Sequence, residues 1–255
     1  IALFERPMAF RLPFRFGAVT VTEAPQAFVR VRVTGEDGQS ATGVAAEMMM
    51  PKWFDKNPAK SPADTIADLR FSLTSAATLY RDGARRPDTA FGHHAGVYPR
   101  QITATAAHGL PSLAGGYGPA LIDKAIVDGV LRLAGLDLAA GLRANVTGLD
   151  SRLSNDLTQE DIDGFLQGVA PQPHVRLRHT IGFLDALDAL ADEITHARLR
   201  YFKIKLGGDV AADCERLRIL TRALETLVPD FAASLDANEQ YDAVRLAALI
   251  AALGD

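Results

Sequence analysis

The stretch that decides the fold is short and reads Tyr201-Phe202-Lys203-Ile204-Lys205-Leu206. Side chains of a β-strand alternate between its two faces, so the apolar residues Phe202, Ile204 and Leu206 share one face. Both lysines share the other. In a parallel sheet whose strands alternate with helices, the apolar face lies under the helices. We therefore expect Lys203 and Lys205 to point away from the helices, into the interior of a β/α barrel.

The next predicted strand, residues 231–238, reads FAASLDAN and repeats this arrangement. Its odd-numbered residues, which are all apolar, are expected to face the helices, and its even-numbered residues are expected to face inward. Asp236 and Asn238 then lie at the carboxyl end of the inward face. A carboxylate at that position is a suitable oxygen ligand for magnesium.

Residues 175–255 as a whole alternate between short apolar strands and amphipathic helices, which predicts parallel β/α units. The predicted strands are 175–180, 201–206 and 231–236. The helices after them should bury the stripes Phe183, Leu187, Leu190, Ile194; Val210, Cys214, Leu217, Leu220, Leu224, Leu227; and Val244, Ala247, Ile250, Leu253. A complete eight-fold barrel takes roughly 250 residues. Three units therefore predict either the start of a barrel that continues beyond Asp255 or a small open sheet.

The first part of the chain has a different pattern. Residues 27–34 alternate valines with arginines, and the turn 35–38 follows, which predicts an antiparallel meander. Helix-start signals occur at Ser61-Pro62 and at Thr158, and a further helix is expected from Pro119 to about Ala134. We therefore expect three regions: an α+β capping domain at 1–140, a connecting helical segment at 141–174 and a partial α/β (TIM-type) barrel at 175–255.

Composition excludes several classes of protein. The net charge is -4 and the sequence pI about 5.9, without a dense basic run, so neither nucleic acid nor an anionic membrane is an expected partner. No apolar segment is long enough to span a membrane, and the start lacks the features of a secretory signal. Cys214 is the single cysteine and is expected to be buried. These features favour a cytoplasmic enzyme; whether it forms a homo-oligomer stays open, and the absence of an initial Met suggests that residues precede Ile1.

Two inward lysines on one strand are costly to bury, and function is the usual reason to retain such a pair. Burial and a neighbouring cation both favour the neutral form of a lysine, so one of the pair can act as a base. The alternatives are a solvated Lys-x-Lys edge, a Schiff-base aldolase that uses the lysine as a nucleophile, and a non-catalytic protein or inactive fragment of the same fold.

Three other motifs carry less weight. His93, His94 and His108 have no acid or cysteine at ligand spacing beside them, so surface or loop positions are expected. Residues 115–118, Gly-Gly-Tyr-Gly, lack the preceding strand and third glycine of a dinucleotide loop and predict a turn before a helix. At the end of the first predicted strand, residues 178–180 read Arg-His-Thr and lie where a barrel contacts its substrate.

The chain resembles the enolase superfamily, in particular its mandelate racemase and muconate lactonizing groups. The resemblance rests on Lys203-Ile204-Lys205 and Asp236-Ala237-Asn238, and it extends to residues 14–17 (FRFG), 50–54 (MPKWF) and 120–125 (ALIDKA). It implies that Lys205 is the proton-abstracting base and Lys203 its electrostatic neighbour. It also implies that Asp236 is one of three carboxylates on Mg²⁺ and that Asn238 is a supporting polar group.

The activity that this resemblance implies is abstraction of a proton alpha to the carboxylate of a small molecule, in a racemase, epimerase, dehydratase or cycloisomerase. Segments 15–19 and 48–54 of the capping domain are then candidates for specificity. The substrate-contact candidates are Arg178, Thr180, Phe16 and Trp53. The family's other metal ligands and its second acid/base residue have no counterpart before Asp255, so the 255 residues alone are expected to be inactive.

Overall fold

The structure, a computed structural model, describes the backbone of residues 1–16, 19–183 and 185–254. Within these ranges it describes all side chains except those of Leu12, Phe14, Phe16 and Leu187. The chain divides into two compact units: unit 1 consists of Ile1–Ala9 and Glu23–Pro171, and unit 2 of Phe10–Thr22 and Gln172–Asp255. The predicted boundaries at residues 140 and 174 stay predictions. Among the described helices, none combines the length and the hydropathy of a membrane span.

The first sheet has three strands in the order β1-β2-β3, namely β1 (Ala2–Phe16), β2 (Val19–Thr34) and β3 (Ser40–Met48). β2 and β3 are antiparallel, with Gln26 opposite Met48 and Thr34 opposite Ser40. The predicted alternation in β2 is confirmed, because Val29 and Val31 are buried, Val33 is partly buried and the arginines are exposed. The meander is therefore present. β1 was not predicted.

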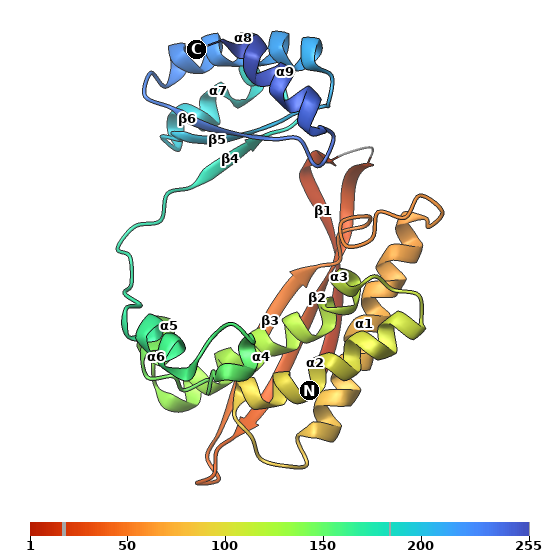
Figure 1. Ribbon diagram of the computed structural model, residues 1–255, viewed down its shortest axis with the longest axis vertical. Coiled ribbons are helices and arrows are strands. Elements are labelled where there is room, and N and C mark those ends of the chain that lie inside the picture. The colour runs from red at the N-terminus through yellow and green to blue at the C-terminus, as the bar shows by residue number, and fades with distance from the viewer. Residues whose placement is uncertain (17–18, 184, 255) are drawn as a thin grey trace. The chain divides into compact units, whose positions relative to one another are not determined.

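Four helices accompany this sheet in unit 1: α1 (Pro62–Gly83), α2 (Ala90–Ala107), α3 (Ser112–Gly115) and α4 (Tyr117–Ala134). α4 lies along β3 (Figure 1), and the two backbones approach closely at Gly43 and Gly129. A Cβ atom at Gly43 would lie 2.0 Å from the carbonyl oxygen of Ala125. The core between sheet and helices contains Val29, Val31, Met49, Leu69, Leu73, Tyr80, Tyr117, Leu121 and Ile122.

The predicted helix ends are confirmed. Ser61 and Asp64 form a capping box at the start of α1, with Pro62 at its first position. α4 ends at Gly135, whose φ of 65° is left-handed and favours glycine. After α5 (Leu138–Arg143) and a short 3-10 helix at Ser151–Leu153, Thr158 and Asp161 form a second capping box at the start of α6 (Gln159–Gln167).

His94 is partly exposed, as expected of a surface histidine, but it lies in a helix and has an acidic partner that the sequence spacing did not indicate. His94 lies within α2, and its Nδ1 atom is 2.7 Å from Oδ2 of Asp123 in α4. Tyr80 of α1 donates a hydrogen bond to Oδ1 of the same carboxylate. The hydrogen bond with Asp123 raises the pKa of His94 although burial opposes the shift. Sequence spacing could not reveal this contact, because the partner lies on another helix.

The second sheet is parallel, in the order β4-β5-β6: β4 (Arg178–Ile181), β5 (Tyr201–Lys205) and β6 (Ala232–Asp236). The helices α7 (Leu187–His196), α8 (Val210–Leu227) and α9 (Ala243–Leu253) lie on one side of it (Figure 1). Phe202, Ile204 and Leu206 are buried under these helices, as predicted, and so is Cys214. The expected fold class, an α+β domain followed by three β/α units, is confirmed.

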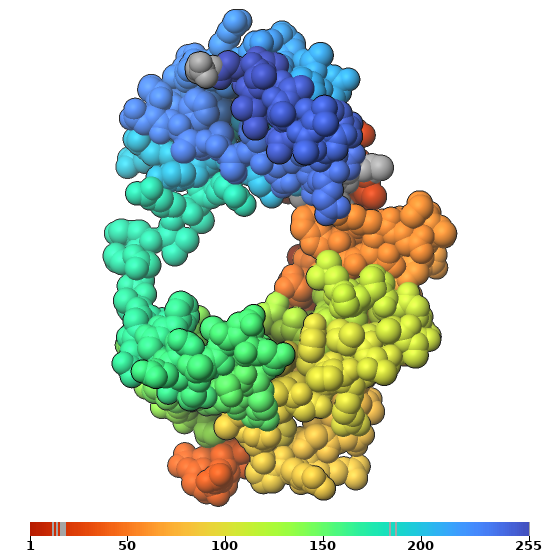
Figure 2. All heavy atoms as spheres, in the orientation of Figure 1, coloured from red at the N-terminus to blue at the C-terminus, as the bar shows by residue number. Residues whose placement is uncertain are grey.

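Three details of unit 2 differ from the prediction. The first strand begins at Arg178 and not at Val175, because residues 169–177 form no helix or strand. Residues 170–178 are exposed (Figure 2). Leu235 is exposed because β6 is the edge strand of the described sheet. In α9 the expected stripe, which includes Val244 and Ile250, faces solvent, and Leu249 is buried instead. That helix is apolar on nearly every side, so its periodicity did not identify the packed face.

Candidate active site

The site forms where two neighbouring parallel strands end. In the register of β5 and β6, Lys203 lies opposite Ser234 and Lys205 opposite Asp236. The backbone N–H of Leu206 donates to the carbonyl oxygen of Asp236 at 2.9 Å, which extends the ladder by one bond. Residues opposite one another in a parallel pair present their side chains on the same face. The lysines and Asp236 therefore meet on the face that the helices leave uncovered.

The three charged groups are in direct contact. Nζ of Lys205 lies 2.8 Å from Oδ2 of Asp236, and Nζ of Lys203 lies 3.1 Å from the same oxygen. Lys205 also donates to Oδ1 of Asn238 at 2.5 Å. The Lys205 side chain is 1% exposed, whereas those of Lys203 and Asp236 are 20% and 29% exposed. Lys205 is therefore a buried ammonium group whose charge is offset by one carboxylate.

Asp236 is ionised throughout the neutral range. Burial alone would raise the pKa of this carboxyl group. Hydrogen bonds from Lys205, from the backbone N–H of Asn238 and from Lys203 outweigh burial and lower the pKa to about 2. The bond from Asn238 requires a tight turn after β6, in which Asn238 has a φ of 46°.

The described residues offer Mg²⁺ one ligand at these strand ends, the Asp236 carboxylate, and do not form a complete magnesium site. Mg²⁺ takes about six oxygen ligands in octahedral geometry. Of the Asp236 oxygens, Oδ2 faces both ammonium groups and Oδ1 accepts the Asn238 N–H. Nowhere in the described ranges do three histidine, cysteine, aspartate or glutamate side chains gather at metal-binding distances. At these strand ends, the described residues thus supply one suitable carboxylate.

The predicted substrate-contact residues lie in different places. Thr180 of β4 is opposite Lys203 and shares the face of the lysines. Arg178 is exposed, with its guanidinium 3.4 Å from the hydroxyl oxygen of Ser234. Trp53 lies in the turn that follows β3 and is exposed. The Phe16 side chain and residues 17–18, which belong to the predicted segment 15–19, lie outside the described residues.

Two residues of α8 that sequence reasoning missed lie against the strand ends. Asp213 is buried and accepts hydrogen bonds from the backbone N–H groups of Gly207 and Gly208. Arg216 donates to the carbonyl oxygens of Lys205 and Gly182. The signal was present in the sequence, because Asp213 and Arg216 flank Cys214 and adjoin Leu217 on the helix face that was predicted to be buried.

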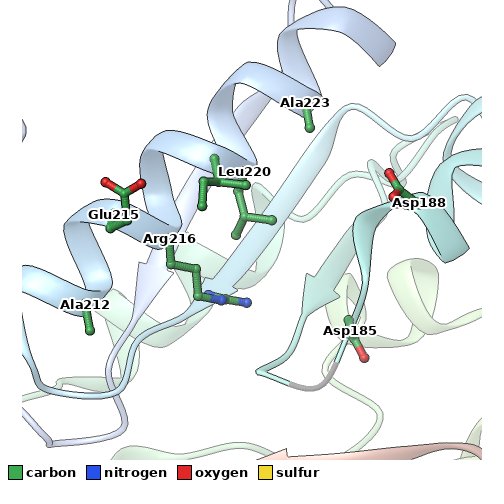
Figure 3. Close-up of a pocket in the computed structure, with 8 residues that line it drawn as sticks. Asp185, Asp188, Ala212, Glu215, Arg216, Leu220 and Ala223 are labelled. Atoms are coloured by element: carbon green, nitrogen blue, oxygen red, sulfur yellow. The ribbon is translucent and has the colours of Figure 1, made fainter.

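A cavity of about 490 Å³ lies between α8 and the segment that leads into α7 (Figure 3). Its lining residues are Asp185, Asp188, Ala212, Glu215, Arg216, Ile219, Leu220 and Ala223. The lysines and Asp236 are not among them. This cavity is therefore distinct from the candidate active site. Arg216 lines the cavity and also donates a hydrogen bond to the carbonyl oxygen of Lys205.

Comparison with solved structures identifies proteins of the same fold. A mandelate racemase/muconate lactonizing enzyme-like protein from Rubrobacter xylanophilus is 18% identical with a TM-score of 0.60, over 99% of this chain and 56% of that one. The L-Ala-D/L-Glu epimerase from Bacillus subtilis, solved in a substrate-liganded complex, is 16% identical with a TM-score of 0.60, over 99% and 58%. An enolase from Bradyrhizobium, complexed with magnesium and mandelic acid, is 19% identical with a TM-score of 0.53, over 98% and 58%.

These matches show that the chain shares its fold with a mandelate racemase/muconate lactonizing enzyme-like protein, an epimerase and an enolase. The chain spans between half and two thirds of the length of the structures that it matches. No protein-family model matches the sequence, and the comparison with curated proteins found no match.

Proposed function

We propose that this chain carries the base of an active site that removes a proton from the carbon next to a carboxylate, as in racemases, epimerases, dehydratases and cycloisomerases. The observation that supports this function is the contact of Lys203 and Lys205 with one oxygen of Asp236, with Lys205 almost fully buried. The fold is shared with an epimerase and with an enolase whose structure contains mandelic acid, a carboxylic acid with a hydrogen on its α-carbon.

Lys205 is the proposed base. With both lysines protonated, the two ammonium groups and Asp236 carry a net charge of +1. Loss of one proton leaves one ammonium group paired with one carboxylate, which is a neutral pair. Lys205 can therefore accept a substrate proton and return to the charged form, while Lys203 keeps Asp236 paired.

Asp236 is proposed as one oxygen ligand of Mg²⁺, together with ligands from outside the described residues. When bound, this ion supplies positive charge where an enolate develops negative charge. Asn238 supports the arrangement through its hydrogen bond from Lys205. Arg178, Thr180, Phe16 and Trp53 are proposed to contact a small-molecule carboxylate.

The test is exchange of the substrate α-proton with solvent deuterium, followed by NMR. The complete gene product that contains these 255 residues is incubated with Mg²⁺ in D₂O and a library of acid sugars, N-acyl amino acids and dipeptides. We expect exchange with at least one class, and Lys205→Ala should slow it roughly a thousandfold because the base is lost. Lys205→Arg preserves the positive charge without a usable base and should be equally slow.

The matched control is Lys124→Ala, which removes an exposed lysine whose partner is Glu47. Its exchange rate should equal that of the wild type. Undiminished exchange in Lys205→Ala would show that another group is the base. No exchange with any acid in the wild type would refute the proposed reaction class.

A further inference from the structure

Arg216 connects the ends of two strands of the second sheet. Its Nη1 atom donates to the carbonyl oxygen of Lys205, the last residue of β5, at 2.7 Å. Its Nη2 atom donates to the carbonyl oxygen of Gly182, directly after β4, also at 2.7 Å. The planar fork of a guanidinium can hold two acceptors in fixed directions at once, which a lysine ammonium cannot do as rigidly.

The side chain of Arg216 is itself held in place. It reaches from α8 into the space between this helix and the segment that carries Asp185 (Figure 3). The guanidinium lies over the ring of Phe183, 5.2 Å from its centroid. Burial lowers the pKa of Arg216, and the charges of Asp213 and Asp185 oppose this shift. The arginine is therefore partly desolvated, which strengthens its hydrogen bonds to the two carbonyl groups.

Asp213, one turn earlier on α8, holds the adjoining loop. It accepts the N–H groups of Gly207 and Gly208 and the hydroxyl of Tyr241, the last at 2.7 Å. Gly208 has a φ of 92°, and a Cβ atom there would lie 2.8 Å from the Gln240 backbone oxygen. Asp213 therefore binds the loop after β5 directly and the loop after β6 through Tyr241.

We propose that Arg216 is a positioning residue for Lys205: by holding the Lys205 carbonyl oxygen it determines where the buried ammonium group lies beside Asp236. The role of Arg216 in catalysis rests on the proposed function. Its effect on the burial of Lys205 can be measured without any substrate. A lysine whose side chain is 1% exposed reacts with reagents only when the structure around it opens locally.

The primary experiment measures reductive methylation of each lysine by peptide mass spectrometry. In the wild type Lys205 should be protected, whereas Lys124, which is half exposed, should react quickly. In Arg216→Lys the fork that holds both carbonyl oxygens is lost, and we expect Lys205 to react roughly tenfold faster because the surrounding structure opens more readily. The reactivity of Lys124 should stay close to its wild-type value.

Two further variants make the result decisive. Arg222→Lys changes an exposed arginine of the same helix and should leave Lys205 protected. Arg216→Gln, whose shorter side chain cannot span to both carbonyl groups, should make Lys205 react at least as fast as in Arg216→Lys and decides the question where Arg216→Lys does not fold. Equal protection of Lys205 in the wild type and in the folded Arg216 variants would overturn the inference.

The α-proton exchange assay separates positioning from binding. For an acid that the wild type exchanges, Arg216→Lys should lower kcat roughly tenfold or more with little change in KM, because a displaced base loses its approach to the proton. An unchanged kcat in a variant with exposed Lys205 would overturn the positioning role. A wild type that exchanges no acid would refute the proposed function. The methylation rates would still test whether Arg216 holds Lys205 in place.

Discussion

At the scale of single residues, one carboxylate organises the candidate site. Asp236 lies within hydrogen-bond distance of Lys203 and Lys205. Without it, Lys205 would be a buried charge whose remaining side-chain acceptor is the amide oxygen of Asn238. Removing one partner of a buried ion pair is costlier than the pair is favourable, because the other charge stays desolvated.

The first prediction concerns Asp236→Asn. At pH 7 we expect the free energy of unfolding to fall by roughly 1–2 kcal/mol, less than for a fully buried pair because Asp236 is partly exposed. The pKa of Asp236 is lowered to about 2 from an ordinary value of 3.8. Its stabilisation is therefore complete above pH 3.8 and is lost as the pH falls toward 2.

Urea denaturation of both proteins between pH 7 and pH 2.5 measures this difference. The advantage of the wild type should shrink over the acid part of that range. Asp230→Asn is the control. Asp230 is exposed, and its Oδ2 atom lies 3.6 Å from Nη1 of Arg200. A wild-type advantage that stays constant down to pH 2.5 would contradict the assigned pKa shift.

At the scale of elements, the contact of α4 with β3 depends on glycine. Gly43 and Gly129 let the two backbones approach to a distance that no side chain permits. This contact determines the distance between α4 and the first sheet, and α1 packs against α4.

The second prediction is that Gly43→Ala lowers the free energy of unfolding by roughly 1–3 kcal/mol, because the added methyl group must displace backbone atoms of α4. Gly96→Ala is the matched control: Gly96 lies in α2 and has open space around its Cα. That variant should be neutral or more stable by up to about 1 kcal/mol. Equal stabilities of the two variants in chemical denaturation would show that α4 can shift freely.

Three helices of unit 1 also meet at one carboxylate. Asp123 of α4 accepts hydrogen bonds from Tyr80 of α1 and pairs with His94 of α2. The pKa of His94 is raised by this hydrogen bond. The extra stability is therefore present below the unfolded pKa of about 6.5 and is lost as the pH rises through the higher folded pKa.

The third prediction follows from that sign. At pH 6 the wild type should be more stable than His94→Gln by roughly 0.5–1 kcal/mol, since the imidazole is partly exposed. At pH 8.5 the difference should be smaller. The control is His93→Gln, which changes the neighbouring residue of the same helix. A wild-type advantage that grows with pH would contradict the pairing with Asp123.

At the scale of the whole molecule, the chain consists of two units with separate cores. Residues 169–177 link α6 to β4 without helix or strand, and their side chains from residue 170 onward are exposed. A protease needs an extended, accessible backbone, so this segment is the expected point of attack.

The fourth prediction is that brief trypsin treatment cleaves first after Arg176. The products are residues 1–176 and 177–255, which mass spectrometry identifies. Arg176→Gln should delay the first cut. First cuts within α1 or α4 would show instead that unit 1 opens before the linking segment is cleaved.

The sequence predicted the second sheet better than the first. Residues 201–206 alternate so regularly that the faces of β5 were correct, and the capping signals at Ser61 and Thr158 located two helix starts. β1 was missed, and the face of α9 was wrong. An apolar helix such as α9 has no preferred side by composition, and only its neighbours select Leu249.

The sequence by itself determined the fold class and the two motifs, Lys203-Ile204-Lys205 and Asp236-Ala237-Asn238, because local alternation decides the face on which each side chain emerges. Tertiary structure decided which groups touch. The register of β5 and β6 places Lys205 beside Asp236, and the docking of α8 places Arg216 on the Lys205 carbonyl oxygen. Contacts between residues distant in the chain depend on packing and strand pairing, which no local pattern encodes.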